Sequence, residues 1–150
     1  MEIILAADHR GFKLKEELKG HLAAAGHDLI DVGAETYEAT DDYVDFAAEG
    51  AKEVLIGEDR VGIFLCGSGH GMDIVANRHK GIRAALCWNE SVARQSREHD
   101  DANVLVLPAD WLSKHDAEVI ADAWLASSFS GAERHERRLK KIREVETRSG

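Results

Sequence analysis

Apolar segments alternate with segments of helical periodicity along the whole chain. Short apolar runs, which predict buried strands, occupy residues 3–7, 28–32, 61–66, 82–87 and 103–107. Between them, apolar residues recur every three or four positions, as in amphipathic helices. These helical segments cover residues 12–25, 43–55, 72–79, about 90–99 and 116–126, and a further helix is expected over 132–147. Strands and helices that alternate in this way predict an α/β fold.

The predicted architecture is a three-layer, Rossmann-like or flavodoxin-like fold. It has a five-stranded parallel sheet with helices on both faces, and an extra helix at the C-terminus. Residues 1–150 are expected to form a single domain, because no linker or repeat interrupts the pattern. Ligands of such folds bind beyond the carboxyl ends of the strands. Residues that directly follow a strand are therefore the first candidates for a functional site.

A glycine-rich loop follows the third predicted strand. The strand ends in Cys66, and the loop reads Gly67-Ser68-Gly69-His70-Gly71 before the next helical segment. A strand, loop and helix in this order direct backbone N–H groups at one point and can hold an anion. The spacing does not fit a dinucleotide fingerprint or a nucleotide P-loop. The loop alone is therefore either an anion site or only a tight turn.

Other polar residues lie close to predicted strand ends. Asp8 and His9 follow the first strand, and His99 ends the helix after the fourth. The strand-end rule predicts that Asp8, His9, Cys66 and Ser68 converge on one crevice, with His99 led back toward the sheet nearby. Each residue also has an ordinary structural role open to it, such as helix capping or core packing. Their combination at one edge favours a site.

Composition narrows the class of partner. The net charge of −9 argues against nucleic acid. No apolar run reaches the roughly 18 residues of a membrane span, and the N-terminus has no signal pattern, so we expect a cytoplasmic protein without a membrane partner. In that compartment Cys66 and Cys87 are expected to be free thiols.

The last helical segment is strongly basic against this acidic background. Arg134, Arg138 and Lys141 follow one another at i, i+4 and i+7 and therefore share one face. Such a face is usually only solvated. Alternatively, paired arginines can clamp a phosphate bidentately. Because small residues at 127–131 precede the helix, it could also reach over a neighbouring subunit.

Seven motifs follow one another along nearly the whole chain. They are Asp8-His9-x-Gly11-Phe12-x-Leu14-Lys15, Asp42-Tyr43, Cys66-Gly67-Ser68-Gly69-x-Gly71, Ala76-Asn77, Gly81-Ile82-Arg83-Ala84-Ala85, Arg97-Glu98-His99-x-x-Ala102-Asn103 and Arg134-His135-x-x-Arg138. Together they resemble the type-B ribose-5-phosphate isomerase family, which includes galactose-6-phosphate isomerase subunits. The resemblance implies an isomerase that uses neither metal nor cofactor and interconverts ribose 5-phosphate and ribulose 5-phosphate through a cis-enediolate.

The resemblance also implies catalytic roles. Cys66 is the base that moves a proton between carbons 1 and 2 of the sugar. Ser68 and the backbone N–H groups of residues 67–71, including Gly67, Gly69 and Gly71, hold the enediolate oxygen. His99 helps to open the furanose ring.

Further roles concern substrate binding. Asp8 contacts sugar hydroxyls, and His9, Arg134 and Arg138 hold the phosphate. Asp100 occupies a position where the family usually has asparagine and is counted as substrate-binding. In the family the arginine helix and the catalytic histidine come from the partner subunit, so a homodimer is expected, possibly paired further into a dimer of dimers.

The base has one rival. Some family members use a carboxylate just after the last loop glycine, where this chain has Met72, and Asp73 lies one residue further. A thiol must lose its proton to act as a base, and we expect the helix N-terminus to lower the pKa of Cys66.

Two departures from the family pattern leave the substrate open. Asp100 replaces an asparagine, and Asp110 stands where an arginine usually follows the fifth strand; a carboxylate near a phosphate repels it. The alternatives are an isomerase of another four- to six-carbon sugar phosphate and a binding module that has lost the chemistry. A metal enzyme using His9, His70 and His99 is disfavoured, because their spacing does not suit a metal site.

Overall fold

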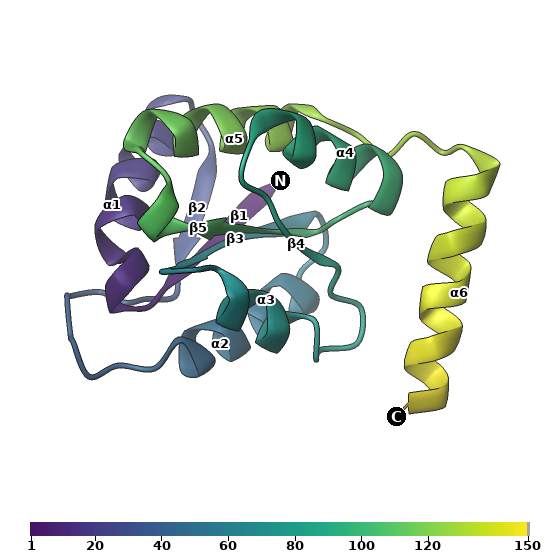
Figure 1. Cartoon of the computed structure of the whole chain (residues 1–150), viewed down its shortest axis with the longest axis horizontal. Helices are drawn as coiled ribbons and strands as arrows, with labels where there is room; N and C mark the ends of the chain where they lie inside the picture. Colours follow the sequence, from purple (N-terminus) through teal and green to yellow (C-terminus); the bar gives the residue numbers. More distant parts are fainter. Residues whose placement is uncertain (150) are drawn as a thin grey trace.

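The computed structural model describes residues 1–149 and arranges them as a sheet flanked by helices (Figure 1). The strands are β1 (Glu2–Ala7), β2 (Asp28–Asp31), β3 (Arg60–Cys66), β4 (Ala84–Leu86) and β5 (Val104–Pro108). The helices are α1 (His9–Ala24), α2 (Tyr43–Ile56), α3 (His70–Ala76), α4 (Glu90–Asp100), α5 (Lys114–Ala126) and α6 (Glu133–Ser149), with a 3-10 turn η1 (Ala109–Trp111) after β5. Every predicted strand and helix is present, and the predicted α/β class is confirmed.

The sheet is parallel throughout, with strand order β2-β1-β3-β5-β4. The chain moves outward from β1 to β2 and then crosses to β3 on the other side of β1. The direction of winding therefore reverses between β1 and β3, which is where ligands bind in open parallel sheets. Because β5 lies between β3 and β4, the last two strands are exchanged relative to the flavodoxin order.

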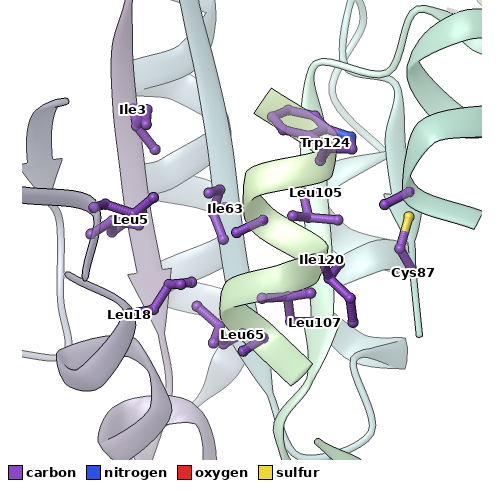
Figure 2. Packing of buried hydrophobic residues seen from close by; sticks show 14 of the residues in the cluster. Ile3, Leu5, Leu18, Ile63, Leu65, Cys87, Leu105, Leu107, Ile120 and Trp124 are labelled. Carbon is purple, nitrogen blue, oxygen red and sulfur yellow. The ribbon is translucent and has the colours of Figure 1, made fainter. Parts of the chain in front are cut away.

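Helices cover both faces of the sheet (Figure 1), and alternate strand residues belong to the cores of the two faces. On the face covered by α1, α4 and α5, strand side chains such as Ile63 and Leu105 lie against α5, which carries the fully buried Trp124 (Figure 2). On the face covered by α2 and α3, Phe64 and Cys66 pack with Met72. The continuous apolar runs in the sequence are explained by burial of both faces.

Helices α1 and α3 begin two or three residues earlier than the apolar pattern indicates. Helix α1 starts at His9 because the Asp8 carboxylate accepts hydrogen bonds from the backbone N–H groups of Arg10 (3.0 Å) and Gly11 (3.1 Å). Helix α3 starts at His70, within the glycine loop, after Gly69 adopts a left-handed conformation with φ of 81°. Capping by a side chain and a turn by glycine thus fix both starts.

Helix α6 stands apart from the rest of the chain beside the β4 edge (Figure 1). Its contacts with the body include a hydrogen bond from the backbone N–H of Gly81 to the Glu146 carboxylate (3.2 Å) and the buried side chain of Leu139. Among residues 1–149, no helix is both long enough and apolar enough to cross a membrane.

Candidate active site

The glycine loop after β3 wraps around the Cys66 sulfur. Cys66 is the last residue of β3 and is only 4% exposed. The backbone N–H groups of Gly69, Gly71 and Met72 approach the sulfur closely enough to stabilise its charged form. The predicted strand, loop and helix therefore do direct N–H groups at one point, and Cys66 lies at that point.

The protonation of Cys66 differs from the expectation. Burial raises the pKa of the Cys66 thiol, and this effect outweighs the opposing effect of the loop N–H groups. The nearby Asp8 carboxylate raises the pKa further, because a second negative charge disfavours the thiolate. The expectation that the helix start lowers this pKa is therefore wrong for the chain by itself. Less of the thiol is ionised at neutral pH, and the thiolate that forms is a stronger base.

Side chains from two other segments close in on the loop. A β-carbon on Gly67 would collide with the guanidinium of Arg10, and one on Gly71 would collide with the ring of Tyr43. Ser68 is half-buried between these glycines, and its hydroxyl accepts a hydrogen bond from the backbone N–H of His70 (3.2 Å). The side chains of Arg10 and Tyr43 therefore lie directly against the loop, one at each of these glycines.

Asp8 and His9 lie at the same edge as Cys66, at the end of β1. Asp8 is 4% exposed and serves both as the cap of α1 and as a charge beside the thiol. The Asp41 carboxylate accepts a hydrogen bond from the backbone N–H of His9 (2.9 Å) and lies 2.7 Å from His9 Nδ1. Sequence reasoning missed Asp41, which comes from an irregular acidic loop.

Asp8, His9 and Asp41 also bring potential metal-ligand atoms within 4.8 Å of one another. Each of these side chains already takes part in a hydrogen bond: Asp8 caps α1, and Asp41 Oδ1 bonds to His9, whereas Asp41 Oδ2 is buried and has no partner among the described residues. The carboxylates and the imidazole therefore have protein partners as they stand.

Asp73, the rival base, is placed less favourably. Its Oδ1 is buried and has no hydrogen-bond partner among the described residues, and burial raises the pKa of the carboxyl group. The Asp73 charge adds to the burial that raises the pKa of Cys87 to about 11, whereas the carboxylate that acts on Cys66 is Asp8. Asp8, rather than Asp73, is the carboxylate that raises the pKa of the Cys66 thiol.

His99 does not lie at the crevice of its own chain. Helix α4 follows β4 and returns antiparallel to the strands, so that its last residues lie near the amino ends, where Val104 of β5 pairs with Gly62 of β3. Cys66 lies at the opposite, carboxyl end. The expectation that His99 leads back toward the crevice is therefore not met within one chain. Instead, the His99 ring stacks on the ring of His135 at the start of α6, with centroids 4.3 Å apart.

The remaining predicted residues lie with His99 rather than with Cys66. Arg134 and Arg138 are exposed on α6, which stands on the far side of the sheet from the β1 end (Figure 1). Asp100 is exposed and lines a groove of about 380 Å³ between α6 and the body. Ile142 and Val145 line the same groove and are 43% and 50% exposed. The structure therefore separates the predicted site into two groups.

Comparison with known proteins identifies close relatives. A sequence family described as Ribose/Galactose Isomerase matches residues 3–142. Ribose-5-phosphate isomerase B of Escherichia coli is 40% identical over 147 residues, which are 98% of this chain and 97% of that protein.

Solved structures match equally well. Ribose-5-phosphate isomerase B of Clostridium thermocellum is 42% identical, with a TM-score of 0.96 and complete coverage of both chains. The Mycoplasma genitalium enzyme, solved with bound ribulose-5-phosphate, is 38% identical, with a TM-score of 0.93 over 97% of this chain and 96% of that one.

Proposed function

Because the chain belongs to the ribose/galactose isomerase family, we propose that it interconverts ribose 5-phosphate and ribulose 5-phosphate without a metal ion, with Cys66 as the base. The observation that carries the proposal is the position of the Cys66 sulfur, at the end of β3, enclosed by the N–H groups of the glycine loop. Relatives at about 40% identity bear the name of this enzyme over almost the full length of the chain.

In the proposed reaction, a proton moves from carbon 2 of the sugar to the Cys66 sulfur and from there to carbon 1. The Cys66 thiolate removes the proton from carbon 2 of the open-chain aldose, and the electron pair of that C–H bond forms the C1=C2 bond of the enediolate. The carbonyl oxygen on carbon 1 takes up the negative charge. The resulting thiol returns the proton to carbon 1, while the hydroxyl proton on oxygen 2 passes to oxygen 1, which gives the ketose. N–H groups of Gly67, Gly69 and Gly71 and the Ser68 hydroxyl stabilise the negative oxygen.

Asp8 and His9 bind the substrate beside this base. Asp8 contacts sugar hydroxyls, and His9 binds the phosphate. Since the Asp41 carboxylate lies 2.7 Å from His9 Nδ1, that nitrogen carries a proton. Nε2 is the atom left for the substrate, and it must also carry a proton to donate a hydrogen bond to a phosphate oxygen. Asp41 therefore orients His9 in this scheme.

A second copy of the chain completes the site. In this proposal, His99 of the partner subunit assists ring opening, and Arg134 of the partner subunit and Arg138 of the partner subunit bind the phosphate. Two observations support a homodimer. His99 and the arginines lie away from Cys66 within one chain, and α6 exposes Ile142 and Val145, whose burial against another subunit would be favourable.

The proposal also covers the domain organisation, the cellular compartment, the role of Asp100 and the assembly of the subunits. Residues 1–150 act as one catalytic domain, and the free thiols Cys66 and Cys87 suit the reducing cytoplasm. Asp100 of the partner subunit contacts the substrate in place of an asparagine. Dimers could also pair further into a dimer of dimers.

The experiment is an isomerase assay over four-, five- and six-carbon aldose phosphates, with and without a chelator. We expect turnover of ribose 5-phosphate that survives chelation, and exchange of the carbon-2 proton in deuterated water. Fastest turnover of another sugar phosphate would reassign the substrate within the same chemistry. Neither turnover nor exchange with any sugar would identify a binding module instead.

A further inference from the structure

Arg10 places a positive charge directly against the glycine loop. It lies in the first turn of α1, and its guanidinium covers the face of Gly67, where even a β-carbon would collide with it. Gly67 is the neighbour of Cys66 in the sequence. The guanidinium therefore lies beside the N–H cradle, at the edge of the sheet where β1 and β3 end.

Asp110 holds this guanidinium in place from a third strand end. Its carboxylate forms an ion pair with Arg10 Nη2. Asp110 belongs to the turn η1 that follows β5, and its backbone N–H donates a hydrogen bond to the carbonyl of Gly67 (3.0 Å). Residues that follow β1, β3 and β5 thus meet at one point of the crevice.

The Arg10–Asp110 pair leaves most of the guanidinium available. The Arg10 side chain is 56% exposed, and Asp110 engages only Nη2, while Nε and Nη1 donate no hydrogen bond to any residue from 1 to 149. An exposed ion pair of this kind contributes little to stability, on the order of 0–1 kcal/mol. Fold stability alone is therefore a weak reason for the arrangement.

Guanidinium groups suit phosphate because their N–H donors form a planar fork that matches two phosphate oxygens. Arg10 directly follows His9, which binds the phosphate in the proposed function. It also offsets the Asp110 carboxylate, which by itself would repel a phosphate at this edge. The Asp110 carboxylate is thus accompanied by a cation that lies against the same loop.

We propose that Arg10 is a substrate-binding residue that donates hydrogen bonds to the phosphate group of the sugar phosphate, and that Asp110 positions it. The inference rests on the proposed function and adds a cation from the same subunit to those that α6 of the partner supplies.

The test compares Arg10→Ala with Arg60→Ala. Arg60 is also ion-paired, with Glu2 and Glu53, but lies at the amino end of β3, at the opposite edge of the sheet. We expect Arg10→Ala to raise the KM for ribose 5-phosphate and the inhibition constant of inorganic phosphate about 10- to 100-fold, with kcat changed less than about threefold. Arg60→Ala should leave both constants near the parent values.

A rescue variant separates binding from folding. Asp110→Arg in the Arg10→Ala background returns a guanidinium to the same place from the β5 end, and should recover most of the lost affinity for phosphate. An unchanged KM and inhibition constant in Arg10→Ala, equal losses in Arg10→Ala and Arg60→Ala, or no rescue would each overturn the role of Arg10.

Calorimetry with inorganic phosphate keeps this inference distinct from the proposed function. If the parent isomerises no sugar but binds phosphate in an Arg10-dependent way, the proposed function fails and the binding role stands. If the parent isomerises ribose 5-phosphate while Arg10→Ala behaves like the parent, only the role of Arg10 is lost. A parent that binds no phosphate would contradict it as well.

Discussion

The crevice at the ends of β1 and β3 and the helix α6 differ in whether their charged side chains have a partner within the chain. In the crevice, Asp8 caps α1, Asp41 bonds to His9, and Arg10 pairs with Asp110. On α6, Arg134 and Arg138 are exposed and form no ion pair with residues 1–149. Apolar Ile142 and Val145 are also about half exposed.

This difference indicates which half of the proposed site is finished in one chain. In the proposal, the base, its oxyanion donors and a first phosphate contact all lie at strand ends, whose positions the buried sheet fixes. The proposed arginine clamp lies on α6, which has few contacts with the rest of its own chain. It therefore needs the surface of a second subunit to form a site. Each prediction below alters one of the two regions and asks whether the other depends on it.

The largest effect is expected in the crevice, at Cys66. Cys66→Ala should lower kcat at least ~100-fold, the usual contribution of a general base. Asp73→Asn should have a much smaller effect, because the carboxylate that influences the Cys66 thiol is Asp8. Steady-state kinetics of both purified variants test the assignment, and a crippled Asp73→Asn beside an active Cys66→Ala would reverse it.

The next effect concerns the apolar side of α6. Ile142→Asp should place a charge in the proposed subunit interface and shift the protein toward monomers, with activity lost on dilution. Ile56→Asp is the matched control, because Ile56 is 66% exposed at the end of α2 and lies on a different part of the surface. Sedimentation and activity as functions of concentration give the answer, and a monomeric parent with full activity would disprove the role of α6.

Smaller changes are expected from the α6 arginines. Arg134→Ala and Arg138→Ala should each raise the KM about 10- to 100-fold with little change in kcat, because a phosphate away from the reacting carbons is bound equally in ground and transition states. Arg148→Ala, in the last turn of the same helix, removes the same charge and should leave the KM unchanged. Similar inhibition of all four proteins by inorganic phosphate would exclude the clamp.

A further effect is expected in the dependence of activity on pH. Because burial raises the pKa of Cys66, the thiolate fraction is small at pH 7 and grows up to tenfold per pH unit until that pKa is passed. We therefore expect kcat/KM to rise between pH 7 and 9. Cys66→Asp should abolish this rise, because a carboxylate is already ionised there. A flat profile for the parent would mean that the base is not this thiol.

The sequence predicted the fold better than the details of the site. Long apolar runs such as β1 and β3 are unambiguous because both sheet faces are buried, and the strand-end rule correctly brought Asp8 and His9 to the edge where Cys66 lies. The starts of α1 and α3 were missed by two or three residues because Asp8 and Gly69 act before the apolar pattern begins. The presence of a helix can be predicted from the periodicity of its apolar residues, whereas the position of its ends depends on single capping or turn residues.

Long-range pairings could not be predicted. Asp41 lies 32 residues from His9, and Asp110 lies 100 residues from Arg10, so no local pattern marks either contact. The position of His99 could have been predicted from the sequence. A helix of 11 residues spans about 16 Å and therefore carries its last turn back to the opposite end of the sheet. The raised pKa of Cys66 could not have been predicted, because the balance between burial and the loop N–H groups depends on how the folded chain packs.

Mixing two inactive variants tests most directly whether the two regions act together across subunits. Cys66→Ala lacks the base and His99→Ala lacks the ring-opening group, so each homodimer should be nearly inactive. Subunit exchange between them places both defects in one of the two sites of a heterodimer and leaves the other site intact. We predict recovery of about a quarter of the parent activity after random exchange, because half of the dimers are mixed and each has one intact site. No recovery, with heterodimers shown to form, would contradict a site shared between two chains.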